Sequence, residues 1–278
     1  MMKYGIIVDS CCDMTSQLAG QLGVTTVPLI MRLGQKEFID DDALDLPGFM
    51  AEMKACKEKV GSASPPPISF TKAMMAAGRS FVVTLSSQIS GAYSSAEIGK
   101  MYAKENGVTD VHVFDSKSAS AGQLLIAVKI RELLAHGQPR EQIIKSVNHF
   151  IDGMKTYFVL ERYDNLLKNG RLNKITEKII SIMNIKLIMG SDKTGNIALY
   201  AKPRGTKQML EKMTSFIAKS GKSTSGEKMV ISHCNNLPLA KQLSNMIKQK
   251  FDFKEILIVP TRGISSLYAD DKGIVMAF

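Results

Sequence analysis

Short apolar runs alternate with longer amphipathic segments along the first half of the chain. The runs are rich in Val, Ile and Phe and have the length of buried strands, whereas the longer segments have the periodicity and end signals of helices. The pattern predicts strands over Tyr4–Val8, Val24–Leu33, Lys36–Ile39, Ser80–Leu85 and Val111–Phe114. It predicts helices over Met14–Leu22, Leu46–Lys57, Ser69–Gly78, Ala92–Asn106, Ala121–His136 and Glu141–Ile151. This alternation predicts a parallel sheet covered by helices on both faces.

Three local features add detail to the first half. Asp13 stands where the N-cap of the first helix is expected, because its side chain can accept from the free N–H groups of the first turn. The stretch Gly61–Pro67 (GSASPPP) is predicted to be a loop, since prolines cannot donate backbone hydrogen bonds. The acidic run Asp40–Asp42 is interpreted as a solvated turn ahead of a helix rather than a cation site.

The second half has a mixed pattern. Polar residues Ser191–Gly195 between two apolar runs predict a β-hairpin. Strands are expected at Thr156–Leu160, Lys186–Gly190, Asn196–Tyr200, Met229–His233, Glu255–Val259 and Ile274–Phe278, and helices at Tyr163–Leu167, Arg204–Ser220 and Leu237–Lys250. We therefore predict an α/β fold of two domains. Residues 1–153 form a three-layer domain around a parallel sheet, residues 154–278 form a mixed α/β domain, and the ligand site lies between or beside them.

Hydroxyl-bearing side chains follow three of the predicted strands of the first domain. These strand ends are Asp9-Ser10, Ser86-Ser87 and Asp115-Ser116. Ligands of parallel sheets bind beyond the carboxyl ends of the strands. The three pairs therefore predict a ligand site rich in hydroxyl groups at one edge of the sheet.

The composition is that of an ordinary globular protein. The chain has 278 residues, of which 45% are hydrophobic and 22% charged, so it can form a large core. No apolar run approaches the roughly 18 residues of a membrane span, and the first residues resemble a strand rather than a secretion signal. The four cysteines form no CxxC pair and the four histidines no HxxxH or HxH pair. We expect a cytoplasmic protein with free thiols and without a metal or cofactor.

The net charge of +10 lies entirely in the second half. Residues 1–150 carry 15 basic and 15 acidic side chains, whereas residues 151–278 carry 21 and 11. This asymmetry indicates an anionic ligand or partner for the second half. Nucleic acid is one candidate, but the lysines are scattered and no aromatic platform accompanies them. A solvated helix surface explains most of them better, so no nucleic-acid partner is expected.

Two loops carry the candidate chemistry. Ser86–Ala96 follows a predicted strand and opens a helix, so that Ser90 and the backbone amide near Gly91 could hold an anion. Ser62–Pro67 places further hydroxyls on a stiff backbone. As alternatives, Ser90 is a simple N-cap and the proline stretch a rigid linker. The chain lacks GxSxG, GxxxxGK[ST] and GxGxxG motifs, and no base accompanies these serines, so they suit holding a carboxylate better than transforming one.

Several segments match the motifs of one known family. The opening Asp9–Asp13 resembles DSxxD, and Ser62–Phe70 resembles the TSQPSPxxF loop with Ser62 in place of threonine. Ser86–Ala96 resembles SSxxSGTYxSA with Ala92 in place of threonine. Further matches are the Phe114–Ser116 loop, the LxxGR segment ending at Gly170-Arg171, and Arg204 after the central hairpin. Through these motifs the chain resembles, along almost its whole length, the DegV family of bacterial fatty-acid-binding proteins, which include the lipid-carrier subunits of fatty acid kinase.

The resemblance implies a long-chain fatty acid as the ligand. Its carboxylate would be held by the hydroxyls of Ser62 and Ser90 near the Gly91 amide, and its tail would lie in an apolar tunnel in the first domain. The 17 methionines could line this tunnel but are mostly assigned to the core. The family implies presentation of the carboxylate to a separate kinase, with Arg171 and Arg204 as contacts for the phosphate or the kinase. The alternative role for these arginines is an inter-domain salt bridge.

The C-terminal segment departs from the family pattern. Many members have a GxHxGPGA loop whose histidine approaches the carboxylate, whereas this chain has Thr261–Gly273 without histidine or GPG. Ser265, Ser266 or Tyr268 could replace that donor.

Three functions are therefore weighed. The first is a fatty-acid carrier without catalytic residues, the second an enzyme acting on a small phosphorylated or carboxylated metabolite, and the third a nucleic-acid binder. The sequence leaves open the preferred chain length and saturation, the existence of a kinase partner and the oligomeric state.

Overall fold

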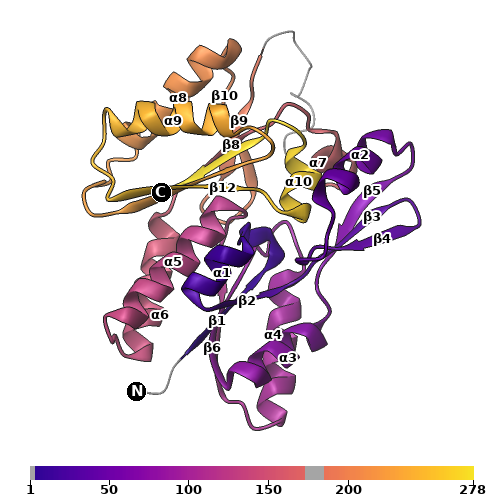
Figure 1. The fold of residues 1–278 in the computed structure, drawn as a ribbon. Helices are drawn as coiled ribbons and strands as arrows, with labels where there is room; N and C mark the ends of the chain where they lie inside the picture. The colour runs from indigo at the N-terminus through magenta and orange to yellow at the C-terminus, as the bar shows by residue number, and fades with distance from the viewer. Residues whose placement is uncertain (1–3, 173–184) are drawn as a thin grey trace.

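The computed structural model describes residues 4–172 and 185–278, in which three sheets are present. The first is wholly parallel, with the order β2 (Val24–Val27), β1 (Gly5–Asp9), β6 (Arg79–Thr84) and β7 (Asp110–Asp115). Figure 1 shows it in the lower half of the molecule. The predicted parallel sheet is confirmed.

Helices cover both faces of this sheet, as the sequence predicts. Successive residues of β1 point to opposite faces: Ile6 and Val8 pack with α1 (Ser16–Leu22), α5 (Ala121–Ala135) and α6 (Arg140–Gly153), whereas Ile7 packs with α3 (Pro67–Ala77) and α4 (Ala92–Glu105). The continuous apolar run in β1 is therefore explained by burial on both sides.

The second sheet is mixed and has the order β10 (Ile197–Ala201), β9 (Ile188–Ser191), β8 (Thr156–Val159), β13 (Ile274–Ala277), β11 (Lys228–His233) and β12 (Glu255–Pro260). Only β11 and β12 pair in parallel. Its outer face packs against α8 (Gly205–Lys219) and α9 (Leu237–Lys248), which lie at the top of Figure 1. The mixed α/β character predicted for the second half is confirmed.

Helix α5 lies between the two large sheets. It packs on β1 and β6 on one side and on Val230 and Val275 of the second sheet on the other, within one core cluster. Nine of its residues are buried, from Ala121 to Ile130. A helix segment buried on all sides needs no polar face, which explains why Ala121–Val128 carries no charged residue, whereas the partly exposed second half carries Lys129, Arg131 and Glu132.

The third sheet is small and antiparallel, with the order β4 (Lys36–Ile39), β3 (Ile30–Leu33) and β5 (Val60–Ala63). It projects to the right in Figure 1 together with α2 (Leu46–Ala55). Its apolar side chains share a core cluster with α7 (Asp164–Lys168) and α10 (Gly263–Ala269). This sheet therefore depends on the C-terminal part of the chain for its core.

Several predicted boundaries are wrong. Val24–Leu33 is two strands in different sheets rather than one, and the break is at Pro28, which has no N–H to donate. Residues predicted as the loop Gly61–Pro67 include the end of β5, where Ser62 pairs with Met31, and the first residue of α3. The connection between β5 and α3 is therefore shorter than the predicted loop.

The first helix has a different cap from the predicted one. Asp13 has a left-handed backbone (φ 53°) and ends the short 3₁₀ helix η1 (Ser10–Cys12), which the sequence analysis missed. The N-cap of α1 is Thr15, whose hydroxyl accepts from the Leu18 N–H. Helix α10 was not predicted either, because serines occupy buried positions where apolar residues would have produced a helical pattern.

Gly99→Ala is expected to lower the free energy of unfolding by about 1–3 kcal/mol, the usual range for overpacking. A Cβ at Gly99 would lie 2.8 Å from the carbonyl oxygen of Pro67 and 2.9 Å from Cβ of Phe70, so α3 and α4 would have to separate. Denaturant unfolding monitored by circular dichroism measures the change. Gly20→Ala in α1 is the control, because its Cβ would meet nothing within 4 Å. Equal destabilisation by the two variants would show that close helix packing at Gly99 is unimportant.

Candidate functional site

A cavity of about 150 Å³ lies beyond the carboxyl ends of the parallel strands, and the loops that follow these strands line it together with residues of the second and third sheets. The walls are mainly apolar. The apolar lining residues are Cys11, Leu29, Leu85, Ile89, Ala119, Phe158, Leu160, Leu166, Ile197, Ile264, Ala269 and Val275. The polar ones are Ser62, Ser64, Ser90, Ser118, Ser120, Thr156, Arg171, Ser191, Asn196, Ser265 and Tyr268, with Gly195 completing the wall. No described methionine is among the lining residues, which agrees with a core role for most methionines.

Two hydroxyl pairs line the cavity, of which one joins the small sheet to α10 and the other joins the loops before α3 and α4. Ser62 on β5 lies 2.8 Å from the hydroxyl oxygen of Tyr268 on α10. Ser64 lies 3.2 Å from the hydroxyl oxygen of Ser90. The structure thus brings Ser62 and Ser90 to the same cavity, each with a partner hydroxyl. Two hydroxyls in contact keep spare donor and acceptor capacity, because only one of their two protons is used between them.

The loop before α4 orients one of these pairs. Ser90 accepts at 3.2 Å from the N–H of Ala92, the first residue of this 14-residue helix, but it precedes the N-cap position, so the alternative of Ser90 as a simple N-cap is wrong. Gly91 is the N-cap residue. A Cβ at Gly91 would lie 3.1 Å from Oγ of Ser64, so glycine permits the close approach of the two loops. Gly91 therefore lies beside the hydroxyl pair.

The two candidate arginines lie in different places. Arg171 lines the cavity, and its side chain donates to the carbonyl oxygens of Ile89, at 2.9 Å, and Asn169. Arg204 is exposed at the start of α8 and is not a lining residue. In residues 4–172 and 185–278 neither arginine forms an ion pair with a carboxylate, so the inter-domain salt bridge considered for them is not seen there.

Buried aspartates fix the backbone around the cavity. Asp9 is fully buried and accepts from the N–H groups of Cys11, at 3.1 Å, and Leu85, at 2.7 Å, and from Nε2 of Gln123. Burial raises the pKa of Asp9 to about 6, although these three hydrogen bonds favour its charged form. The carboxyl group therefore ties the end of β1 to the end of the neighbouring strand β6.

Asp13 and Asp40 hold the N-terminus of α10. Asp13 accepts from the Arg262 N–H at 2.8 Å and from the hydroxyl of Ser120. Asp40 accepts from the N–H groups of Gly263 and Ile264 at 2.8 and 2.9 Å. Burial raises the pKa of Asp13 to about 7. It also raises the pKa of Asp40. The interpretation of Asp40 as part of a solvated turn is wrong, because its side chain is fully buried and caps a helix.

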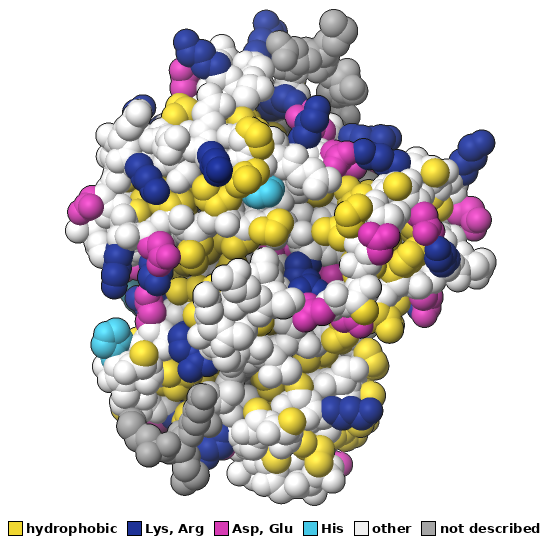
Figure 2. All heavy atoms as spheres, viewed as in Figure 1, with side chains coloured by type: hydrophobic (Ala, Val, Ile, Leu, Met, Phe, Trp, Pro, Cys, Tyr) yellow, Lys and Arg dark blue, Asp and Glu magenta, His cyan; other side chains and the backbone are white. Residues whose placement is uncertain are grey.

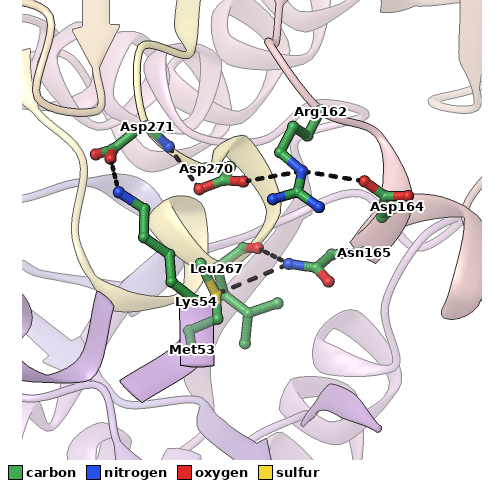
Figure 3. A network of polar contacts seen from close by, with 8 residues as sticks. All are labelled: Met53, Lys54, Arg162, Asp164, Asn165, Leu267, Asp270 and Asp271. Atoms are coloured by element: carbon green, nitrogen blue, oxygen red, sulfur yellow. Dashed lines mark hydrogen bonds and ion pairs between the residues drawn. The ribbon is translucent and has the colours of Figure 1, made fainter. Parts of the chain in front are cut away.

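A polar network joins α2, α7 and the end of α10 on the outer side of Tyr268 (Figure 3). Nδ2 of Asn165 donates to the carbonyl oxygen of Leu267 at 2.8 Å, and Lys54 forms an ion pair with Asp271. Arg162 lies between Asp164, at 3.2 Å, and Asp270, at 3.8 Å. The network holds the helix that carries Tyr268 against α2 and α7.

Sequence reasoning missed Ser64 and the structural aspartates, and named Tyr268 only as one of three replacements for a histidine. Of the other two, Ser265 lines the cavity and contacts Cys11, whereas Ser266 bonds to Thr261 at 2.8 Å and is not a lining residue. The DSxxD motif was the available signal for Asp9 and Asp13, since a carboxylate at a strand end commonly accepts from loop amides.

The molecular surface shows no concentrated basic area on the side seen in Figure 2. There the Lys and Arg side chains are dispersed among uncharged atoms and acidic side chains. In the described part of the chain no helix is long and apolar enough to cross a membrane. Across the same residues no group of three or more His, Cys, Asp or Glu side chains is placed to hold a metal ion.

Known proteins of one family are similar to this chain in sequence and in fold. The sequence pattern of the family described as uncharacterised protein, DegV family, matches residues 3–277. A DegV domain-containing protein of Streptococcus gordonii is 34% identical over 280 aligned positions, covering 100% of this chain and 99% of that protein. The chain belongs to the DegV family, as its motifs indicate.

Solved structures of relatives agree. A DegV family protein from Ruminococcus gnavus, refined with vaccenic acid, has a TM-score of 0.95 and 36% identity, with all of both chains covered. The fatty acid kinase (Fak) B3 protein of Streptococcus pneumoniae, loaded with linoleic acid, has a TM-score of 0.91 and 31% identity, covering 100% of this chain and 99% of that one. The predicted α/β fold class is confirmed.

Asp13→Asn is expected to change how stability depends on pH. The pKa of Asp13 is about 7 in the folded protein and near 3.9 unfolded, so the folded state holds a proton that the unfolded chain releases. As pH rises from about 4 to about 7, wild type should lose up to about 1.4 kcal/mol per pH unit of unfolding free energy relative to the variant. Denaturant titrations of both proteins across this range measure the difference.

The comparison between the two proteins is needed because other groups also titrate. Burial lowers the pKa of His112 to about 4, which makes wild type and variant alike more stable as pH rises from about 4 to about 6.5. A stability difference that stays constant with pH would show that Asp13 is ionised throughout this range.

Proposed function

We propose that this protein binds a long-chain fatty acid, with its carboxylate among the hydroxyls of Ser62, Tyr268, Ser64 and Ser90 and its tail along the apolar walls. The observation that carries the proposal is the arrangement of the cavity, in which two hydroxyl pairs adjoin a mainly apolar enclosure. The N–H groups at the start of α4 add a favourable field for an anion. Tyr268 takes the part of the histidine that this chain lacks.

The energetics favour a long apolar tail. Each methylene moved from water to an apolar wall contributes about 0.8 kcal/mol, so a tail of about 16 carbons offsets the loss of translational and rotational freedom on binding. A cavity of about 150 Å³ holds a benzene-sized guest. A long tail must therefore push the lining side chains apart, and binding widens the cavity. The fatty acids in the related structures, vaccenic and linoleic acid, support a ligand of this length.

The protein is proposed to carry its ligand rather than transform it. Within residues 4–172 and 185–278 no histidine, lysine or carboxylate side chain is hydrogen-bonded to the two hydroxyl pairs, and hydroxyls alone hold a carboxylate without activating it. Because one relative is a fatty acid kinase protein, we propose that a kinase receives the carboxylate, with Arg171 near the ligand and Arg204 on the surface as contacts for phosphate or partner. The four free cysteines support a cytoplasmic location. The domain division at residue 153 stays a prediction.

An enzyme that acts on a small anionic metabolite is the alternative. Such a ligand needs polar groups on several sides, whereas this cavity is lined mainly by carbon atoms. The alternative is therefore less well supported.

Native mass spectrometry of gently purified protein is expected to show an adduct with the mass of a fatty acid. Protein stripped of lipid should bind a fluorescent fatty acid, and oleic acid should displace it. Heating with and without oleic acid provides a second measure, because a ligand that binds only the folded state raises Tm. Failure of both adduct and binding would refute the proposal, and tight binding of a short polar acid instead would favour the enzyme.

Headgroup variants are expected to weaken fatty-acid binding. A hydrogen bond to a charged group contributes about 1.5–3 kcal/mol, so Tyr268→Phe should raise the Kd for oleic acid about tenfold or more, and Ser62→Ala/Ser90→Ala should raise it further. Fluorescence displacement gives each Kd.

Ser80→Ala is the matched control, because Ser80 is buried in β6 and is not a lining residue. Unchanged affinity in Tyr268→Phe would remove this hydroxyl from the headgroup site. The Kd for a fatty alcohol of the same length should change less in these variants, because the alcohol carries no charge.

A further inference from the structure

A third hydroxyl pair faces the cavity away from the headgroup residues. Oγ of Ser118, in the loop before α5, lies 2.7 Å from Oγ1 of Thr156 at the start of β8. Both residues line the cavity and are 3% and 6% exposed, so this pair is cut off from solvent. Their neighbours in the wall include Phe158 and Val275, which are apolar. A polar pair is therefore built into the part of the cavity where the proposed function alone calls for hydrocarbon.

The position of the pair corresponds to the middle of a ligand. Leu160, the next residue after β8, lies near Ala269, the residue after Tyr268, because a Cβ at Gly273 would come within 2.8 Å of Ala269 and 3.2 Å of Leu160. Thr156 lies four residues earlier along the same extended segment, which places it about 13 Å further along the wall at about 3.3 Å per residue. A fatty acid held at Ser62 and Tyr268 would pass the pair with the central part of its tail.

The surrounding backbone is shaped around the two hydroxyls. A Cβ at Gly122 on α5 would lie 2.1 Å from Oγ of Ser118 and 2.9 Å from Oγ1 of Thr156, so only glycine leaves room for the pair. Ser116 fixes the loop, because its hydroxyl donates to the carbonyl oxygen of Ser118 at 3.0 Å and accepts from the Ser118 N–H at 3.1 Å. The hydroxyls are thus held in place before any ligand arrives.

The pair has hydrogen-bonding capacity to spare. Two hydroxyls carry two protons, and only one is used between them. The one other recorded contact of either hydroxyl within the described residues is that of Ser118 with the Ala119 carbonyl oxygen, at a long 3.4 Å. An unsubstituted hydrocarbon segment would bury the two hydroxyls without forming hydrogen bonds to them, and this cost weakens binding. A hydroxyl group on the ligand can both donate to the pair and accept from it.

We propose that Ser118 and Thr156 form a subsite for a hydroxyl group in the middle of the acyl chain, so that the protein selects hydroxylated long-chain fatty acids over unsubstituted ones. This inference rests on the proposed function, since it needs the carboxylate to lie at the other hydroxyl pairs.

Ricinoleic and oleic acids test the subsite, because they share chain length and double bond and differ by one mid-chain hydroxyl. Wild-type protein is expected to bind ricinoleic acid about fivefold more tightly, which corresponds to one net hydrogen bond. Thr156→Val keeps the shape of the side chain and removes the hydroxyl, so the preference should disappear or reverse while the Kd for oleic acid stays equal or falls. Ser118→Ala should have the same effect, and serves if the valine variant fails to fold.

Thr214→Val is the control for a buried threonine outside the cavity, since Thr214 on α8 is 2% exposed and bonds to the Leu210 carbonyl oxygen. Thr214→Val should keep the wild-type preference for ricinoleic acid over oleic acid. Equal Kd values for the two acids in wild type, or a preference that survives both Thr156→Val and Ser118→Ala, would overturn the subsite and leave the proposed function intact. Failure of wild type to bind either acid would overturn the proposed function itself.

Discussion

Buried backbone N–H groups must find acceptors, and in this protein three aspartates supply them around the cavity. Asp9 joins the ends of β1 and β6, while Asp13 and Asp40 hold the start of α10. Each carboxylate connects chain segments that are distant in sequence. Without these acceptors the loops at the carboxyl ends of the strands would carry unpaired amides in an apolar enclosure, which costs about 1–3 kcal/mol for each group. The shape of the cavity therefore depends on carboxylates that never need to touch a ligand.

The sequence predicts those elements whose apolar period is simple. The parallel strands were found because burial on both faces produces continuous Val, Ile and Phe runs, and the amphipathic helices because one face stays polar. Helix α10 and η1 could not be found in this way. Their buried positions are filled by serine and cysteine, which pack in the core only because partners from other parts of the chain satisfy them.

The candidate site was predictable only in part. Ser62, Ser90 and Gly91 were identified through loop motifs, and the structure brings Ser62 and Ser90 to one cavity, with Gly91 beside Ser64. Tyr268 could not be assigned, since its partner Ser62 is 206 residues away and only the fold brings them together. For Asp40 the opposite error arose. From the sequence alone, an acidic run is expected to be exposed to solvent. In the structure Asp40 is buried, because it accepts hydrogen bonds from the N-terminus of α10, which lies near the other end of the chain.

The small antiparallel sheet has a consequence for how this protein can diverge. It carries Ser62 and shares its core with α10, which carries Tyr268, whereas Thr156 and Phe158 belong to the large mixed sheet. In the proposed carrier, Ser62 and Tyr268 for the acid group and Thr156 and Phe158 for the tail thus belong to different sheets and helices. Mutations in one set of residues can alter which headgroup is tolerated without disturbing the other, and the converse holds for the acyl chain. Descendants of this chain can therefore acquire new lipid preferences in two independent evolutionary steps.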